Sequence, residues 1–210
     1  MNGLAIVDKP AGRTSQDVTA RLRRAYDTRR IGHGGTLDPM ATGVLPVFVG
    51  RATRAVEFAE QGEKEYLAGL KLGLSTDTQD TTGEVLETHP VTCTRTEIEA
   101  ALAGFRGEID QIPPMYSALK INGQKLCNLA RKGKTVERPP RKITIHALEL
   151  GEQLGEDEYA LRVRCSKGTY VRTLCHDIGQ VLGCGGCMSS LRRTMAAGFD
   201  LSQAVTLETV

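Results

Sequence analysis

The segment Arg30–Pro46, RIGHGGTLDPMATGVLP, contains the residues best suited to chemistry. Its glycines permit backbone conformations that other residues avoid and let a ligand approach the chain closely. Asp38 precedes Pro39, and a proline disfavours helical backbone at the residue before it. A carboxylate on a rigid loop could be a catalytic group. Asp before Pro is also common in ordinary turns, where the side chain bonds nearby backbone groups, so both interpretations stay open.

Charge is distributed in blocks along the 210 residues, although the net charge is only +2. Residues 1–54 have a net charge of +5, residues 55–112 of −8 and residues 113–148 of +7. Two basic blocks separated by an acidic one predict a surface with a positive face. Nucleic acid would suit such a face, but charges that simply sit in water would give the same pattern.

Six cysteines are too few for a disulfide scaffold, so a reducing cytoplasm is the expected location. Cys184 and Cys187 have CxxC spacing, but zinc sites normally add a second close pair. Buried or scattered thiols are the alternative, and we expect no metal. The longest apolar run, Val44–Val49, is broken by Pro46 and is far shorter than the roughly 20 residues of a membrane span. The motif GxxxxGK[ST] of phosphate-binding loops is missing.

The elements that must position Asp38 alternate between strands and helices. Ser15 is the expected N-cap of the first helix, and residues 32–46 are expected to form a loop. No regular βαβ repeat is present, which favours an α+β fold. Apolar or alternating runs predict strands at residues 3–8, 65–73, 84–88, 141–150, 158–165 and 191–195, and periodic runs predict helices at residues 15–26, 52–60, 94–103, 124–131 and 169–182.

The string GHGGTLDPMATGVLPV closely resembles the catalytic loop of the TruB-type tRNA pseudouridine 55 synthases. The family usually has Thr where Gly34 stands. The resemblance runs from about Asn2 to Val210, with the motifs in the family's order: DKPAGRTS at 8–15, KEYLAGLKLGLSTDTQDTTG at 64–83, PPMYSALKINGQ at 113–124, CSKGTYVRTLCHDIG at 165–179 and LRRT at 191–194.

This resemblance implies that uridine is isomerised to pseudouridine in the T-arm loop of tRNA. The N1–C1′ bond breaks, the uracil turns and C5 bonds to C1′, with no metal or organic cofactor. The implied fold is a pseudouridine synthase catalytic domain over residues 1–210, with a mixed, mainly antiparallel sheet. An insertion at about 113–142 would close over the RNA, and the family's C-terminal PUA domain would be absent. The expected enzyme is a cytoplasmic monomer that binds tRNA, with no membrane contact and no obligate protein partner.

The resemblance also assigns catalytic residues. Asp38 matches the essential carboxylate, which could add to the sugar or base or assist C2′ deprotonation. Arg172 matches the arginine that pairs with it, although an exposed helix arginine is the plain alternative. Tyr66 matches the tyrosine that stacks on the base and is placed to remove the C5 proton; its plain alternative is a half-buried strand residue. A non-enzymatic RNA-binding module would need none of these three.

Further residues match positions that bind substrate or RNA. Tyr170 and Leu191 would line the pocket, with core packing as the alternative for both. His33 would enter the RNA loop where the flipped base had been, unless it is a turn residue bonded to backbone. Asp80 is expected to hold a turn together. The remaining matches are basic residues expected to contact RNA or to support the site: Lys9, Arg54, Lys120 and Lys132.

Overall fold

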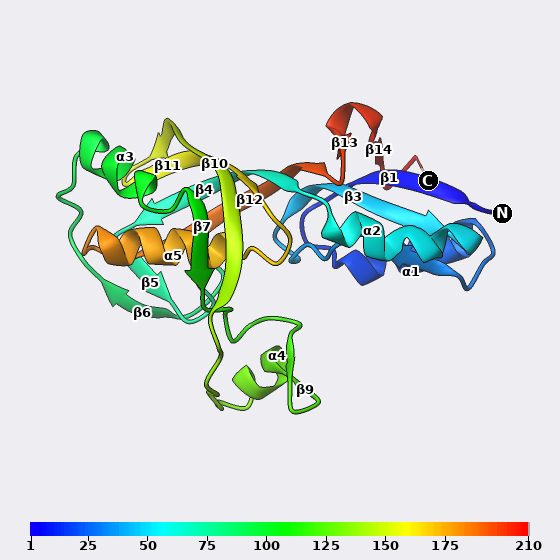
Figure 1. The fold of residues 1–210 in the computed structure, drawn as a ribbon, viewed down its shortest axis with the longest axis horizontal. Coiled ribbons are helices and arrows are strands. Elements are labelled where there is room, and N and C mark those ends of the chain that lie inside the picture. Colours follow the sequence, from blue (N-terminus) through cyan, green and yellow to red (C-terminus); the bar gives the residue numbers. More distant parts are fainter. Residues whose placement is uncertain (210) are drawn as a thin grey trace. The chain divides into compact units, whose positions relative to one another are not determined.

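The computed structural model describes residues 1–209, which form two compact units. Unit one contains residues 1–67, 162–167 and the chain from Ser190 onward, and unit two contains residues 68–161 and 168–189. The strands β4 (Lys64–Leu72), β11 (Glu158–Cys165) and β12 (Gly186–Ala196) each contribute residues to both units (Figure 1). Whether residues 1–210 act as one catalytic domain stays a prediction.

The sheet of unit one is built around β3 (Thr42–Val49). β3 runs antiparallel to β1 (Gly3–Lys9) and to β2 (Ile31–His33), and it pairs in parallel with β12 at Arg192 and Arg193. Two short strands complete this sheet: β13 (Phe199–Asp200) is antiparallel to β12, and β14 (Val205–Thr206) is parallel to β1. The mixed, mainly antiparallel pairing that we expected is therefore present.

The expectation of a loop over residues 32–46 is wrong at both ends. Ile31–His33 and Thr42–Val49 are strands, and only residues 34–41 form an irregular connection. The reason is long-range, because β3 pairs with β1 over residues 43–49 and is buried from Gly43 onward. Gly43 has φ +104, and a Cβ there would lie 2.2 Å from the carbonyl oxygen of Arg193. This glycine allows β3 to lie directly against β12.

The helix α1 (Ser15–Ala25) packs on this sheet with Val18 and Leu22, and the partly buried Tyr26 at its C-cap joins them. The expected N-cap, Ser15, is wrong, because Thr14 caps the helix in a capping box with Asp17. Ser15 is buried, and its Oγ accepts from Leu37 N at 2.9 Å and donates to Leu37 O. The expected helix at 52–60 is a 3-10 helix at Gly50–Ala55 followed by α2 (Val56–Gln61).

In unit two the strand order is β12, β4, β11, β10 (Arg141–Gly155) and β7 (Gly107–Gln111), with β7 antiparallel to β10. Unit two also contains the helices α3 (Arg95–Ala103) and α5 (Val171–Val181). Strands and helices in both units confirm the α+β class. The remaining elements of this unit are the pair β5 (Leu74–Thr76) and β6 (Val85–Thr88), and, between β7 and β10, β8 (Lys120–Ile121), β9 (Gln124–Lys125) and α4 (Leu126–Ala130).

Within residues 1–209, no helix has the length and apolar character needed to cross a membrane.

Gly179 is a point where α5 and β12 meet backbone to backbone. A Cβ on Gly179 would lie 2.1 Å from the amide nitrogen of Gly186, and the carbonyl of Gly179 accepts from Gly185 N at 3.0 Å. We expect Gly179→Ala to lower the free energy of unfolding by about 1–3 kcal/mol, because neither backbone can yield cheaply. The measurement is urea denaturation of both proteins.

The matched control is Gly104→Ala at the end of α3, where the nearest atom to the added Cβ is 3.5 Å away. Gly104 has φ −70, which alanine adopts freely. An equal urea midpoint for the parent and Gly179→Ala would contradict the close contact.

Candidate active site

The loop that carries Asp38, residues 34–41, is held by backbone hydrogen bonds within unit one. Gly34 N donates to Pro46 O at 2.9 Å, and Pro39 O accepts from Gly12 N at 2.8 Å. The Asp38 carbonyl accepts from Ala41 N at 3.0 Å, which closes the turn after the Asp-Pro step. The loop is therefore fixed at both sides of Asp38, whose side chain is half-buried.

Gly34 has no room for a side chain. A Cβ there would lie 2.7 Å from the Cβ of Ala59 and 3.3 Å from the ring of Phe48. The methyl group of Ala59 on α2 occupies the space that a side chain at position 34 would need.

Lys9 also binds this loop, and its side chain is fully buried. Its Nζ donates to Pro10 O at 2.9 Å, to Arg13 O at 2.6 Å and to Pro39 O at 3.3 Å. Burial lowers the pKa of Lys9, and the Asp38 carboxylate opposes this effect. Lys9 therefore places a positive charge near Asp38, while its donors are given to backbone carbonyls.

Arg193 is the residue of this site that sequence reasoning missed. It lies on β12 with 1% of its surface exposed. Its Nε donates to Val44 O at 2.8 Å, and Nη2 and Nη1 donate to Gly35 O at 3.0 Å and Thr36 O at 3.4 Å. A signal was available, because strand side chains alternate and Arg193 lies two residues beyond Leu191 in LRRT. Leu191 is also buried.

Tyr66 lies on the strand β4 with 8% of its surface exposed, so it is more buried than the alternative supposed. Burial is the main effect on its phenol and raises the pKa of Tyr66. The charge of Arg193 and a hydrogen bond from it act in the opposite direction, and the Asp38 carboxylate raises the pKa further. Unit one thus brings Asp38, Tyr66, Lys9 and Arg193 into one electrostatic environment.

His33 ends β2 and is half-buried. Burial lowers the pKa of His33, with a further decrease from the charge of Arg193; Glu60 and a backbone bond to Gly35 oppose both. Its Nδ1 is buried without a hydrogen-bond partner among residues 1–209. Its place in the RNA loop stays a prediction.

Arg172 lies on α5 in unit two with 5% of its surface exposed, so the alternative of an exposed helix arginine is wrong. Its Nη1 donates to Thr78 O at 3.0 Å, its Nη2 donates to Tyr116 O at 2.9 Å, and its Nε lies 3.9 Å from Asp80 Oδ2. Two carbonyls and a carboxylate therefore fix its orientation. Its pairing with Asp38, which belongs to unit one, stays a prediction.

Asp80 holds a turn, as we expected. Its Oδ1 accepts from Thr82 N at 3.0 Å, from Thr82 Oγ1 at 2.5 Å and from Thr78 Oγ1 at 2.9 Å. Tyr170, the residue before α5, exchanges two backbone hydrogen bonds with the side chain of Gln111. Its role in lining a substrate pocket stays a prediction.

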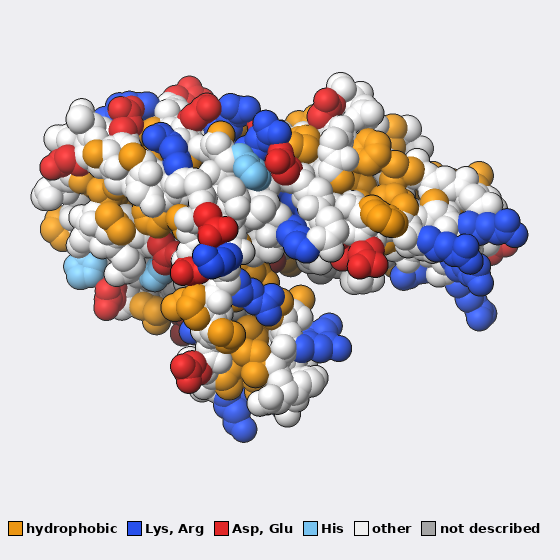
Figure 2. Space-filling model, viewed as in Figure 1, with side chains coloured by type: hydrophobic (Ala, Val, Ile, Leu, Met, Phe, Trp, Pro, Cys, Tyr) orange, Lys and Arg blue, Asp and Glu red, His pale blue; other side chains and the backbone are white. Residues whose placement is uncertain are grey.

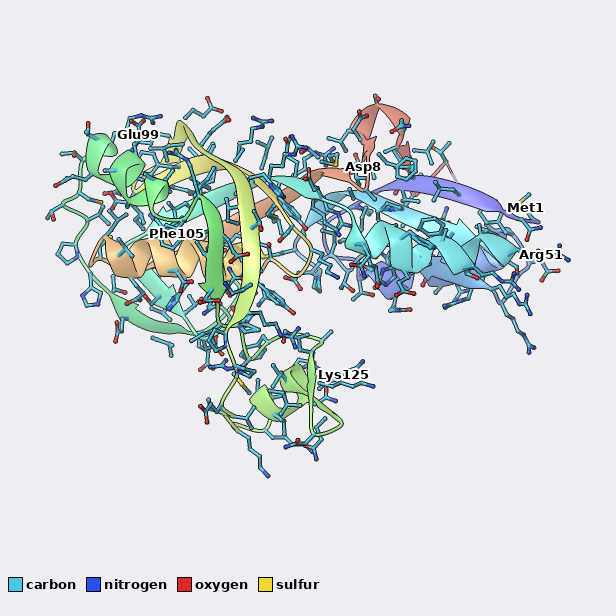
Figure 3. All side chains as sticks on the ribbon, in the orientation of Figure 1. Met1, Asp8, Arg51, Glu99, Phe105 and Lys125 are labelled. Carbon is cyan, nitrogen blue, oxygen red and sulfur yellow. The ribbon has the colours of Figure 1, made fainter. Side chains whose placement is uncertain are left out.

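The segment between β7 and β10 presents exposed basic side chains. Lys120 and Lys132 are both exposed there, and Figure 2 shows lysine and arginine side chains on the part that contains α4. Lys125 extends away from this segment (Figure 3). In unit one, Arg54 is exposed in the last turn of the 3-10 helix.

The CxxC pair has the character of buried thiols. Cys184 and Cys187 are both buried, and the Cys184 thiol donates to Gly185 O at 3.5 Å. Burial raises the pKa of Cys187 to about 11. Zinc binds thiolates, so a thiol held in the protonated form is a poor ligand. Among residues 1–209, no three or more His, Cys, Asp or Glu residues form a group that could hold a metal.

Two solved structures, compared next, share the fold of this chain over 98% of its length. The structure of a Cbf5-Nop10-Gar1 complex contains a chain that matches with a TM-score of 0.77 and 33% identity, over 98% of this chain and 52% of that one. The chain thus spans about half the length of that relative. A second match, with a TM-score of 0.73 and 30% identity over 98% of this chain and 51% of that chain, is an H/ACA RNP bound to a substrate RNA containing 2′-deoxyuridine.

Sequence comparison identifies the family to which the chain belongs. The profile of the TruB family pseudouridylate synthase N-terminal domain matches residues 23–171, and the profile of the tRNA pseudouridylate synthase B C-terminal domain matches residues 172–210. A tRNA pseudouridine synthase B from Azoarcus sp. (strain BH72) is 50% identical over 99% of this chain and 69% of its own length. One from Opitutus terrae is 49% identical over all of this chain and 87% of its own. The chain belongs to the TruB family of pseudouridylate synthases, which confirms the resemblance.

His33 gives the site a pH-dependent stability. Because its pKa is lowered in the folded protein, the unfolded chain binds a proton first as the pH falls below about 6.5. The free energy of unfolding therefore decreases as the pH falls through that value and below it. We expect His33→Gln to show a smaller decrease than the parent in urea denaturation at about pH 7.5 and about pH 5.5.

His146→Gln is the control, since that histidine is exposed on β10. The assignment is rejected if His33→Gln and His146→Gln lose stability with pH to the same extent.

Proposed function

We propose that this chain isomerises uridine to pseudouridine at position 55 in the T-arm loop of tRNA. Membership of the TruB family and the similarity, over at least 99% of this chain, to proteins named tRNA pseudouridine synthase B support this function. The observation that carries it is the fixed Asp38 loop, held beside Tyr66 by the buried cations Lys9 and Arg193.

Asp38 would break the N1–C1′ bond as an ionised carboxylate. Lys9 places its positive charge near Asp38 from a fixed position. The carboxylate can add to the sugar or the base, or it can remove the C2′ proton; each route needs the same charged oxygen. Arg172, already oriented by Thr78 and Tyr116, would complete the site by pairing with Asp38.

Tyr66 would act after the uracil has turned and C5 has bonded to C1′. The C5 proton must then leave, and the phenolic oxygen of Tyr66 is proposed to take it. Burial favours the neutral phenol, whereas the charge of Arg193 favours the phenolate, which is the form in which this oxygen can accept a proton. The ring of Tyr66 would stack on the base, with Leu191 and Tyr170 lining the rest of the pocket.

RNA binding must offset the cost of extruding the uridine, which is a few kcal/mol. Exposed basic groups such as Lys120, Lys132 and Arg54 would contribute through phosphate contacts. His33 would occupy the space that the base leaves. Lys9 has no exposed surface, so its proposed contribution is to hold the Asp38 loop.

The proposed substrate, tRNA, indicates where in the cell the protein would act. A tRNA-modifying enzyme would act in the cytoplasm, and we propose that this one works there as a monomer without an obligate protein partner. The absence of a cofactor also stays a prediction.

Asp38→Asn should abolish turnover while RNA binding changes little, because the amide keeps the shape of the carboxylate and loses its charge. The measurement is tritium release from a T-arm stem-loop that contains 5-tritiated uridine, together with the Kd for the same RNA. Asp27→Asn, at an exposed position, is the matched control and should keep full activity. A loss below tenfold, about 1.4 kcal/mol in the barrier, would exclude Asp38 as the central group. Full activity would instead favour an RNA-binding role for the loop.

Lys132→Gln combined with Lys134→Gln should weaken RNA binding and reduce its salt dependence. The slope of log K against log salt should fall by about 0.7–0.9 for each phosphate contact that is lost. Arg138 is left unchanged, because its Nε is buried and its removal would disturb packing.

The control is Arg95→Gln with Arg162→Gln, which removes the same charge outside residues 113–142. These two residues form ion pairs with Glu99 and Glu65. If both double variants change the slope equally, the segment between β7 and β10 acts only through net charge.

A further inference from the structure

We propose that Tyr116 is a positioning residue that uses both of its polar groups to hold the guanidinium of Arg172 in place. The inference rests on the proposed function, in which Arg172 completes the site. The carbonyl oxygen of Tyr116 accepts from Arg172 Nη2 at 2.9 Å, and its hydroxyl donates to Asp77 Oδ2 at 3.0 Å. Thr78, the neighbour of Asp77, accepts from Arg172 Nη1 at 3.0 Å through its carbonyl. These four residues therefore form a closed ring of contacts within unit two.

The turn between β5 and β6 fixes the carboxylate that Tyr116 binds. Asp77 N donates to Glu84 O at 3.1 Å, and Glu84 N donates to Asp77 Oδ1 at 2.8 Å. A Cβ at Gly83 would collide with that same carboxylate oxygen, so the turn closes tightly only because glycine stands there. One oxygen of Asp77 is thus used inside the turn, and the other, Oδ2, is presented to Tyr116.

The backbone of α5 is held by other contacts, so the ring acts on a side chain rather than on the helix. Gln111, at the end of β7, exchanges two hydrogen bonds with the backbone of Tyr170, at 2.9 Å and 3.1 Å. Thr173 Oγ1 donates to Gln79 Oε1 at 2.7 Å. These bonds do not involve Tyr116. Removal of its hydroxyl would therefore leave the helix in place and release only the carbonyl that faces the guanidinium.

Tyr116 also lies where the basic segment between β7 and β10 begins. Pro113 and Pro114 are buried before it, and their rings restrict the backbone that leads to it. Directly after it, Ser117 O accepts from Cys127 N at 3.0 Å, which ties the start of the segment to α4. A single anchor thus serves both the exposed segment and the guanidinium.

The bond between Tyr116 and Asp77 suits orientation more than stability. Tyr116 is partly exposed, and a hydrogen bond that water can replace adds only modestly to the stability of a fold. A carboxylate only accepts hydrogen bonds, so the hydroxyl of Tyr116 must donate. The bond raises the pKa of Tyr116, so the phenol keeps its proton and continues to donate near neutral pH. Its direction and its place beside Arg172 therefore fit a role in fixing the guanidinium.

The first test follows the guanidinium of Arg172 without any RNA. Rotation about its Nε–Cζ bond is measured by NMR of the isotope-labelled protein, and Arg172→Lys assigns the signal by removing it. Tyr116→Phe keeps the ring and the carbonyl and removes only the hydroxyl. We expect the rotation to become about three- to tenfold faster in Tyr116→Phe, the effect of weakening one hydrogen bond. An unchanged or slower rotation overturns the proposal.

Tyr159→Phe is the matched control, because Tyr159 is a partly exposed tyrosine on β11 that belongs to the same unit and lies outside the ring. It should leave the rotation of Arg172 unchanged. An equal change in both variants would overturn the proposal, since the effect would then not come from the bond to Asp77. Urea denaturation shows whether both variants are folded under the conditions of the measurement.

The second test separates the reaction from binding in single-turnover tritium release from the T-arm stem-loop. Tyr116→Phe should slow release at saturating RNA by about 10–100-fold, because a small misplacement of an active-site group is costly. The Kd for the same RNA should stay unchanged. A weaker Kd with an unchanged rate would overturn the proposal, since Tyr116 would then only anchor the segment between β7 and β10.

A double-mutant cycle with Arg172→Lys shows whether the effect passes through the guanidinium. Tyr116→Phe should add little slowing in the Arg172→Lys background, because the group that it positions is already absent. Equal slowing in both backgrounds would overturn the proposal, since a merely structural Tyr116 would act on both alike.

The two tests separate the two possible failures. If the parent releases no tritium from the T-arm RNA, the proposed function fails, while the NMR measurement still reports on Tyr116 and Arg172. If the parent is active and the rotation of Arg172 is the same in Tyr116→Phe, only the role of Tyr116 fails.

Discussion

Buried positive charge bound to backbone carbonyls is the constraint on which the site in unit one depends. Lys9 and Arg193 donate to carbonyls of the loop around Asp38, on either side of the Asp-Pro step. A buried cation that gives its donors to carbonyls keeps its charge while its desolvation cost is reduced. The same bonds thus fix the loop and place positive charge near Asp38.

This arrangement depends on strand pairing, because the two cations come from different strands. Lys9 ends β1 and Arg193 lies near the end of β12, with β3 between the two strands. The glycine at position 43 is part of this pairing, since any side chain there would collide with the backbone of Arg193. The glycines of the motif therefore serve the packing of the sheet as well as the loop.

In unit two, Arg172 is likewise oriented by hydrogen bonds to backbone carbonyls. Asp80 closes a turn with Thr78 and Thr82, and that turn presents the Thr78 carbonyl to the guanidinium. Met188 of β12 fixes the turn through backbone bonds to Gln79 and Thr81. In both units a catalytic candidate is therefore held by main-chain groups, whose positions the sheet determines, and this favours a precise geometry over an adaptable one.

The sequence by itself determined the family, the α+β class, most strands and helices, and Asp38, Tyr66 and Arg172 as candidates. Alternation, helix periodicity and local motifs are short-range signals that a chain displays without folding. Tertiary structure alone decided that residues 42–49 form a strand, because pairing with β1 outweighs the local effect of Gly43 and Pro46. It also decided that Arg193 binds the carbonyl of Gly35 and that Lys9 binds the carbonyl of Pro39, since those partners lie far away in the chain and meet only when the strands are assembled.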